Sequence, residues 1–132
     1  MHSMKKQRDT VKKDKTISLL MNDLEDKFLI KGLKILRQVD KKYRIEDFAK
    51  EDKKNIKETI SIRGLLNYYE IIGVGIKSDI YDIGMIRDAH KTMIARIYEI
   101  TEPFIKRSRI EDNNQELWIK FEDSVEILKE GQ

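Results

Sequence analysis

Two apolar helical patterns joined by one short turn occupy the segment from Arg63 to Tyr98. Apolar residues that recur every three or four positions lie on one face of a helix. The first row is Leu66, Tyr69, Ile72 and Ile76, and the second is Ile83, Ile86, His90, Met93, Ile94, Ile97 and Tyr98. Asp82 precedes the second row, where a carboxylate can cap the first free amides of a helix. The segment therefore predicts a helical hairpin.

Helical spacing also precedes the hairpin. One row consists of Ile17, Leu20, Met21, Leu24 and Phe28. Asn22-Asp23 is expected to interrupt this helix, because Asn and Asp compete for backbone hydrogen bonds. A second helix is expected from about Asp26 through Val39, and a short helical turn at 45–49 should place Phe48 against the core. The first hairpin helix is then expected to begin near Glu51 and to end near Lys77-Ser78.

The C-terminal third adds one further helix. Pro103 lacks a backbone donor, so the second hairpin helix should either kink there or stop and restart. Asn113-Asn114 marks a turn, and a final amphipathic helix follows with the apolar residues Leu117, Trp118, Phe121, Val125 and Leu128. No strand-like alternation is present in the sequence. The predicted fold is an all-α, single-domain bundle of about five or six helices around the central hairpin.

Composition narrows the class of protein. A chain of 132 residues fits one domain with one modest core. The absence of cysteine excludes a disulfide framework and thiolate metal sites. No apolar run approaches the roughly 18 residues that span a bilayer, so no membrane span is expected and the cytoplasm is the expected location. The excess of Ile over Leu, 20 to 10, and of Lys over Arg, 19 to 8, favours a bacterium with an AT-rich genome, or one of its phages.

Positive charge is concentrated at the N-terminus. Residues 1–15 carry six basic and two acidic side chains, or +4, while the whole chain carries +3. We therefore divide the chain into a basic, flexible N-terminal arm, 1–15, and a helical domain, 16–132. The arm is either a solvated, frayed terminus or a contact for phosphate groups.

A series of short motifs runs through the domain in a fixed order. It comprises Leu66-Asn67-Tyr68-Tyr69-Glu70, Gly75-Ile76-Lys77, Ile80-Tyr81-Asp82, Arg96, Pro103-Phe104-Ile105 and Trp118-Ile119-Lys120-Phe121-Glu122. The series resembles the bacterial family catalogued as domain of unknown function 4760, over roughly Thr16 to Leu128. This resemblance implies a small helical domain and no established activity. Many members of that family carry an N-terminal transmembrane segment, whereas this chain has the basic arm there.

Candidate sites for chemistry all have simpler structural interpretations. His90 lies on an apolar helix face, and the other histidine, His2, is in the arm, so a two-histidine metal site would need the arm to fold back. Glu70 and Arg96 are predicted to form a structural ion pair across the hairpin. Gly73 and Gly75 lack the strand and third glycine of a dinucleotide loop and are interpreted as helix-packing positions. We expect no cofactor, no metal and no catalytic residues.

Two classes of function follow, and a third is weaker. The first is a non-enzymatic protein-interaction or regulatory module of a bacterium or its mobile elements, with a protein partner or a second copy bound through Tyr68, Tyr81, Met85 and Trp118. The second is a sequence-nonspecific nucleic-acid binder, whose phosphate contacts would be Lys5, Lys6, Arg8, Lys12, Lys13, Lys106, Arg107 and Arg109. The third is an enzyme with a substrate pocket inside the bundle.

Overall fold

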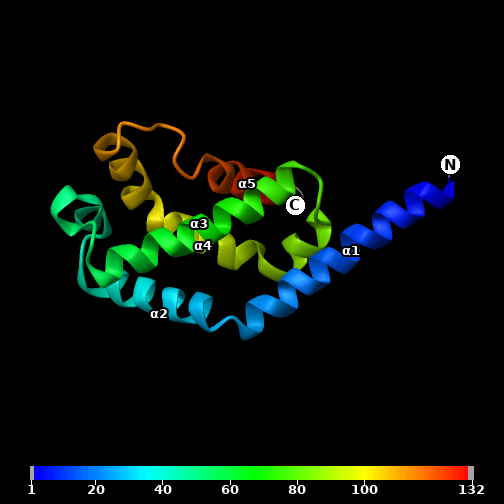
Figure 1. The fold of residues 1–132 in the computed structure, drawn as a ribbon, viewed down its shortest axis with the longest axis horizontal. Helices are drawn as coiled ribbons and strands as arrows, with labels where there is room; N and C mark the ends of the chain where they lie inside the picture. Colours follow the sequence, from blue (N-terminus) through cyan, green and yellow to red (C-terminus); the bar gives the residue numbers. More distant parts are fainter. Residues whose placement is uncertain (1, 131–132) are drawn as a thin grey trace.

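The computed structural model describes residues 2–130, and its elements are helical throughout that range (Figure 1). Five α-helices and two short 3-10 helices follow one another along the chain. They are α1 (His2–Glu25), α2 (Lys27–Lys42), η1 (Ile45–Ala49), η2 (Glu51–Lys53), α3 (Lys57–Lys77), α4 (Ile83–Glu111) and α5 (Ile119–Glu130). The predicted all-α bundle is therefore confirmed.

Helices α3 and α4 are joined by the predicted short turn, but they do not pack against each other as the predicted hairpin required. Asp79 turns the chain with a positive φ of 60°, and the Asp82 carboxylate caps α4 by accepting a hydrogen bond from the Met85 amide at 3.0 Å. The two helices then diverge. Helix α3 packs mainly against α5 and α2, whereas α4 packs against η1 and α5. The hairpin is thus a connection between two helices that are held chiefly by other elements.

Helix α5 closes the core between the two arms of the hairpin. Phe121, which is fully buried, stacks on Tyr69 of α3 with ring centroids 5.3 Å apart and meets the Tyr98 ring of α4 edge-on at 5.5 Å. Gly73 allows this approach, because a Cβ atom there would collide with the carbonyl of Lys120. Gly75 likewise leaves room for the ring of Tyr81. Both glycines are therefore packing positions, as the sequence indicated.

Helix α4 continues through Pro103 without an interruption, so the expected stop does not occur. Phe104 and Ile105, the next two residues, are completely buried and belong to the main core cluster. Their packing fixes the chain on the far side of the proline, and this compensates for the missing backbone hydrogen bond.

The first helix break lies at Asp26 and not at Asn22-Asp23. The Asp26 carboxylate accepts hydrogen bonds from the amides of Phe28 and Leu29, at 2.9 and 3.0 Å, and thereby starts α2. Residues 2–15 form the first half of α1, so no element boundary separates the proposed arm from the domain. Lys, Arg and Gln favour helix, and this segment contains neither Gly nor Pro. Figure 1 shows α1 projecting from the body, with the N-terminus at its far end.

Candidate functional site

Exposed large apolar side chains follow one another along the second half of α1 and the start of α2. Ile17, Met21, Leu24 and Phe28 are 46%, 62%, 73% and 70% exposed, respectively. Ile17, Met21 and Leu24 are spaced by four and three residues and therefore share one face of α1, and Phe28 follows on the first turn of α2; we call these four residues the apolar row. The sequence identifies this face correctly but does not show that it points to solvent. In the described part of the chain the row covers no core.

The opposite face of α1 attaches to the body through polar groups. The buried Thr16 hydroxyl accepts a hydrogen bond from the Asp82 amide at 2.8 Å and donates one to the Lys12 carbonyl at 2.7 Å. One helical turn further along α1, the partly buried Leu19 packs against the core. After one more turn, the Asp23 carboxylate accepts a hydrogen bond from the Tyr68 hydroxyl. Residues 16, 19 and 23 share one helix face, so the row is directed away from the body.

Asp23 has an unusual protonation equilibrium. Burial, with a smaller contribution from the negative charge of Asp26, raises the pKa of Asp23 to about 6. The hydroxyl of Tyr69 has no hydrogen-bond partner among the described residues; burial raises its pKa, and the nearby charge of Asp23 raises it further. At neutral pH the Asp23 carboxylate is therefore ionised within the contact between α1 and α3, where its buried surroundings disfavour the negative charge.

The apolar surface continues from the row onto α3. The Phe28 ring lies over Gly64, where an added Cβ atom would be 3.3 Å from the ring. Ile60 and Ile71 share a helix face with Gly64, and both are exposed. Phe28 therefore connects the row on α1 to further exposed apolar side chains on α3.

The interaction residues expected from the sequence are only partly available. Tyr68 and Tyr81 are half-buried, the first bonded to Asp23 and the second packed on Gly75, and Met85 is also half-buried. Trp118 is 3% exposed, so its assignment to an interaction surface is wrong. Its Nε1 donates to Asn67 Oδ1 at 2.8 Å, and its ring packs against Phe104. Trp118 is a core residue.

The predicted ion pair between Glu70 and Arg96 does not form. Glu70 Oε1 accepts a hydrogen bond from the backbone amide of Phe121 at 2.8 Å, close to the start of α5. Arg96 lies on an exposed face of α4, where its nearest carboxylate partner is Glu99 at 3.6 Å. The prediction assumed that α3 and α4 pack against each other, whereas α5 packs on both.

The expected phosphate contacts are dispersed over the surface. Arg109 is buried and donates to the Leu117 carbonyl and to Glu122, so it is unavailable to an external anion. Arg107 pairs with Glu111 at 2.8 Å, and Lys106 lies 3.8 Å from Glu102. The basic residues of the proposed arm are on α1, at the other end of the molecule. The structure does not assemble these two groups into one site.

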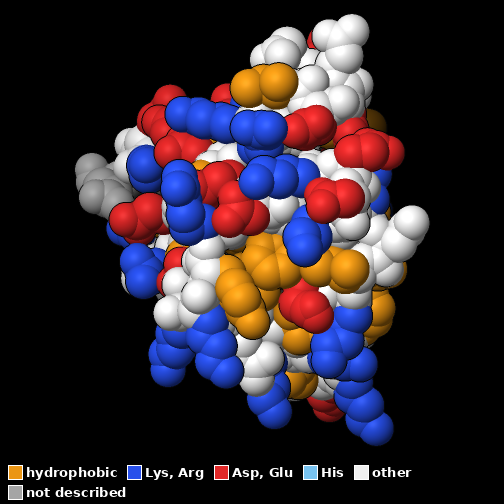
Figure 2. Space-filling view, turned by 90° about the vertical axis from the view of Figure 1, so that its left-hand side faces the viewer, with side chains coloured by type: hydrophobic (Ala, Val, Ile, Leu, Met, Phe, Trp, Pro, Cys, Tyr) orange, Lys and Arg blue, Asp and Glu red, His pale blue; other side chains and the backbone are white. Residues whose placement is uncertain are grey.

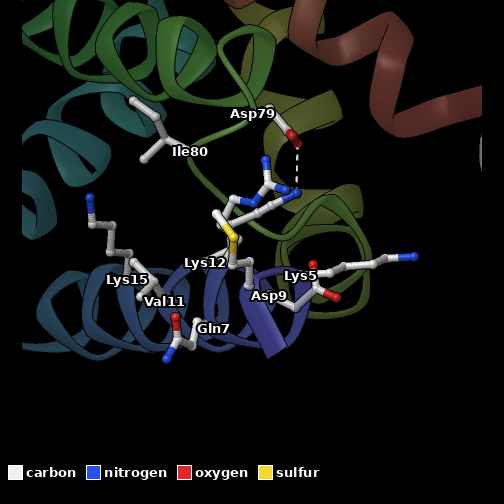
Figure 3. A pocket seen from close by; sticks show the side chains of 10 residues that line it. Lys5, Gln7, Asp9, Val11, Lys12, Lys15, Asp79 and Ile80 are labelled. Carbon is white, nitrogen blue, oxygen red and sulfur yellow. Dashed lines mark hydrogen bonds and ion pairs between the residues drawn. The ribbon is translucent and has the colours of Figure 1, made fainter. Parts of the chain in front are cut away.

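An open hollow of about 650 Å³ lies between the first half of α1 and the turn before α4 (Figure 3). Lys5, Lys12 and Lys15 contribute to its lining, and the Lys12 ammonium pairs with the Asp79 carboxylate at 2.8 Å across it. A smaller hollow of about 420 Å³, bordered by Tyr43, Phe48 and Ile56, lies at the opposite end of the molecule. Figure 2, which views the molecule from this end, shows an apolar patch that is surrounded by charged side chains.

His90 is half-buried on α4. Its Nε2 is buried without a hydrogen-bond partner, and burial lowers its pKa, so the neutral imidazole is favoured. The side chain of His2 lies outside the described part of the structure. Among the residues described, no three His, Cys, Asp or Glu side chains are grouped to hold a metal ion.

Comparison with known protein families identifies the family to which the chain belongs. No helix among residues 2–130 has the length and apolar content needed to cross a membrane. No curated protein and no solved structure matches the chain. The sequence profile of one family matches residues 2–127, which is nearly the whole chain and covers α1 as well as the bundle. The protein therefore belongs to the family described as Domain of unknown function (DUF4760).

Proposed function

We propose that this protein is a non-enzymatic protein-interaction module that binds its partner through the apolar row of α1 and α2. The observation that carries the proposal is the exposure of Ile17, Met21 and Leu24 on one face of α1, followed along the chain by the exposed Phe28 at the start of α2. Contiguous exposed apolar surface of this kind marks a contact site more often than an isolated exposed residue does. A regulatory role in the cytoplasm of a bacterium, or of a cell infected by its phage, is part of the proposal.

The row provides enough apolar surface for a moderate affinity. Complete burial of a side chain of this size stabilises a complex by about 1.5–3 kcal/mol, and one half to three quarters of each is exposed here. Four such side chains contribute roughly 4–8 kcal/mol before the costs of association. A partner helix with apolar residues at the same spacing would fit the row. A second copy of the chain presents such a helix and is the first partner to test.

Nucleic-acid binding by the N-terminal half of α1 is the alternative. Lys5, Lys6, Arg8 and Lys13 form no ion pair within 4 Å in residues 2–130, although Lys12 pairs with Asp79. The two proposals predict different effects of salt concentration on the binding affinity. Binding to phosphates weakens steeply as salt is added, whereas an apolar contact changes little.

A pull-down from lysate of the source organism tests the proposal, with nuclease-treated and untreated samples. The bait is the wild-type protein, the Leu24→Lys variant or the Ile110→Lys variant. Ile110 is a matched control, because it is 69% exposed against 73% for Leu24 and lies on α4, away from the row. Sedimentation velocity of the same three proteins, over a range of concentrations, tests self-association.

We expect a stoichiometric, nuclease-resistant protein, or a dimer, with the wild type and with Ile110→Lys, and a loss of either with Leu24→Lys. Recovery of nuclease-sensitive material alone would favour the alternative. Equal capture by all three baits would contradict a role for the row.

A further inference from the structure

Helix α2 carries a concentration of positive charge that neither function described above uses. Between Lys27 and Lys42 the chain has six basic residues and one acidic residue, Asp40. Lys27, Lys31, Lys34 and Lys41 are spaced by four, three and seven residues, so they follow one face of the helix, and we call them the basic row. The opposite face is buried and consists of Leu29, Gly32, Ile35, Leu36 and Val39.

The basic row is not neutralised by the protein itself. All four lysines are exposed, and neither they nor Arg37 has a carboxylate within 4 Å in residues 2–130. Basic residues elsewhere do have such partners, for example Lys77 with Asp123 at 2.8 Å. Figure 2 shows Lys and Arg side chains gathered in the lower part of the view, where α2 lies. The positive potential of this face is therefore available to an external anion.

A hollow next to the basic row gives the surface a concave shape. It has a volume of about 430 Å³ and lies between α2 and α4. Its lining has four cations, Lys34, Arg37 and Lys41 from α2 and Arg96 from α4, against one carboxylate, Asp40. Arg96 also borders a second hollow on α4, to which Lys91 contributes. Glu99 is the carboxylate nearest to Arg96, at 3.6 Å, and both side chains are largely exposed. The cations of the two helices thus face one groove.

We propose that the basic row and this groove bind the phosphate backbone of double-stranded nucleic acid without reading its sequence. The row extends over fourteen residues, or about 21 Å at 1.5 Å per residue, which corresponds to about six base pairs. No aromatic side chain lines the groove, so it offers no platform for the unstacked bases of a single strand. Lysine and arginine side chains in a row suit the regularly spaced phosphates of a duplex.

Fluorescence anisotropy with a labelled duplex of sixteen base pairs tests this site, with DNA and RNA duplexes in separate experiments. The test variant carries Lys34→Glu and Lys41→Glu, and the matched control carries Lys5→Glu and Lys6→Glu on α1. Each pair of substitutions changes the net charge by four, from +3 to −1. All four side chains are exposed, so both variants should retain the fold, which circular dichroism verifies. Polyphosphate and vesicles of phosphatidylglycerol serve as competitors.

We expect the α2 variant to bind at least about tenfold more weakly than the wild type in 0.1 M salt, and the α1 variant to retain most of the affinity. With about four phosphates contacted, the logarithm of the binding constant should fall with that of the salt concentration with a slope of about −3 to −4. An equal or larger loss in the α1 variant would assign binding to α1 and overturn the proposal. Absence of duplex binding, or a clear preference for the vesicles or polyphosphate, would also overturn it.

Discussion

Replacement of Trp118 by alanine should remove a large part of the stability of the fold. The indole is 3% exposed, packs against Phe104, and receives the guanidinium of Arg63 at 5.0 Å from its ring centroid. Truncation of a buried Trp costs about 3–5 kcal/mol through lost burial and the resulting cavity. Loss of the cation–π contact adds about 0.5–1 kcal/mol at a partly exposed site. The positive φ of 57° at position 118 is strained for tryptophan and for alanine alike, so it does not change the difference in stability between the two proteins.

The hydrogen bond from Nε1 to Asn67 contributes less, since Asn67 is exposed and water can replace the indole as its partner. The sum is about 4–6 kcal/mol, out of the 5–15 kcal/mol typical of a whole domain. Trp118→Phe keeps an aromatic ring against Phe104 and should cost about 1–2 kcal/mol.

Urea denaturation followed by far-UV circular dichroism measures these differences, because Trp118 is the sole tryptophan and the variants have no indole to report on. In the wild-type protein, emission of Trp118 should be blue-shifted and protected from a soluble quencher. A loss below about 1 kcal/mol for Trp118→Ala would refute the burial on which this reasoning depends.

Three further predictions concern packing, protonation and the N-terminal segment. Gly73→Ala should destabilise the fold by about 2 kcal/mol, because the added Cβ atom collides with the Lys120 carbonyl. Gly32→Ala should be neutral or stabilising, because the added Cβ atom has no contact nearer than 3.8 Å. Equal effects of the two substitutions in urea denaturation would contradict this packing. The pKa of Asp23 lies at about 6 in the folded state, above its ordinary 3.8, so its contribution to the free energy of unfolding is greatest below pH 3.8 and falls as the pH rises through 6. The wild type should therefore lose stability relative to Asp23→Asn between pH 4 and pH 7, and a constant difference across that range would show that this pKa is not raised. Removal of residues 1–15 should leave a cooperative thermal transition, because none of the described side chains at 3–15 is buried; a non-cooperative melt would show that α1 folds with the bundle.

Local signals in the sequence predicted some helix boundaries correctly, although α3 begins at Lys57 and not near Glu51. Asp26 and Asp82 were expected as helix starts, and both carboxylates accept hydrogen bonds from the amides of the helix that follows. Capping depends on residues within one turn, so the sequence contains the information that it needs. At Pro103 the sequence left a kink or a stop open, and the stop does not occur because the buried Phe104 and Ile105 outweigh the local preference; that burial is a tertiary effect.

The candidate site was harder to predict because it depends on which faces meet. The periodicity of Ile17, Met21 and Leu24 shows that they share a helix face, but a row of this kind is the same whether it faces a core or solvent. The pairing of Glu70 with Arg96 failed for the same reason, since it required knowledge that α5 packs on both α3 and α4. The sequence left two roles open for Trp118, on the apolar face of the last helix or at an interaction surface, and its packing with Phe104 and its hydrogen bond to Asn67 could not be deduced from spacing.

The exposure of the apolar row is the central claim, and the free energy of unfolding of the double variant Met21→Ala, Leu24→Ala tests it most directly. Alanine preserves helix propensity, so the measurement isolates the packing of the two side chains. Leu36→Ala, a buried position on α2, is the comparison and should cost about 2–5 kcal/mol. For the double variant, measured at low protein concentration, we predict a change within about 0.5 kcal/mol, as for surface substitutions. A loss of more than about 2 kcal/mol would show that the row packs within the fold and would contradict its role as a contact surface.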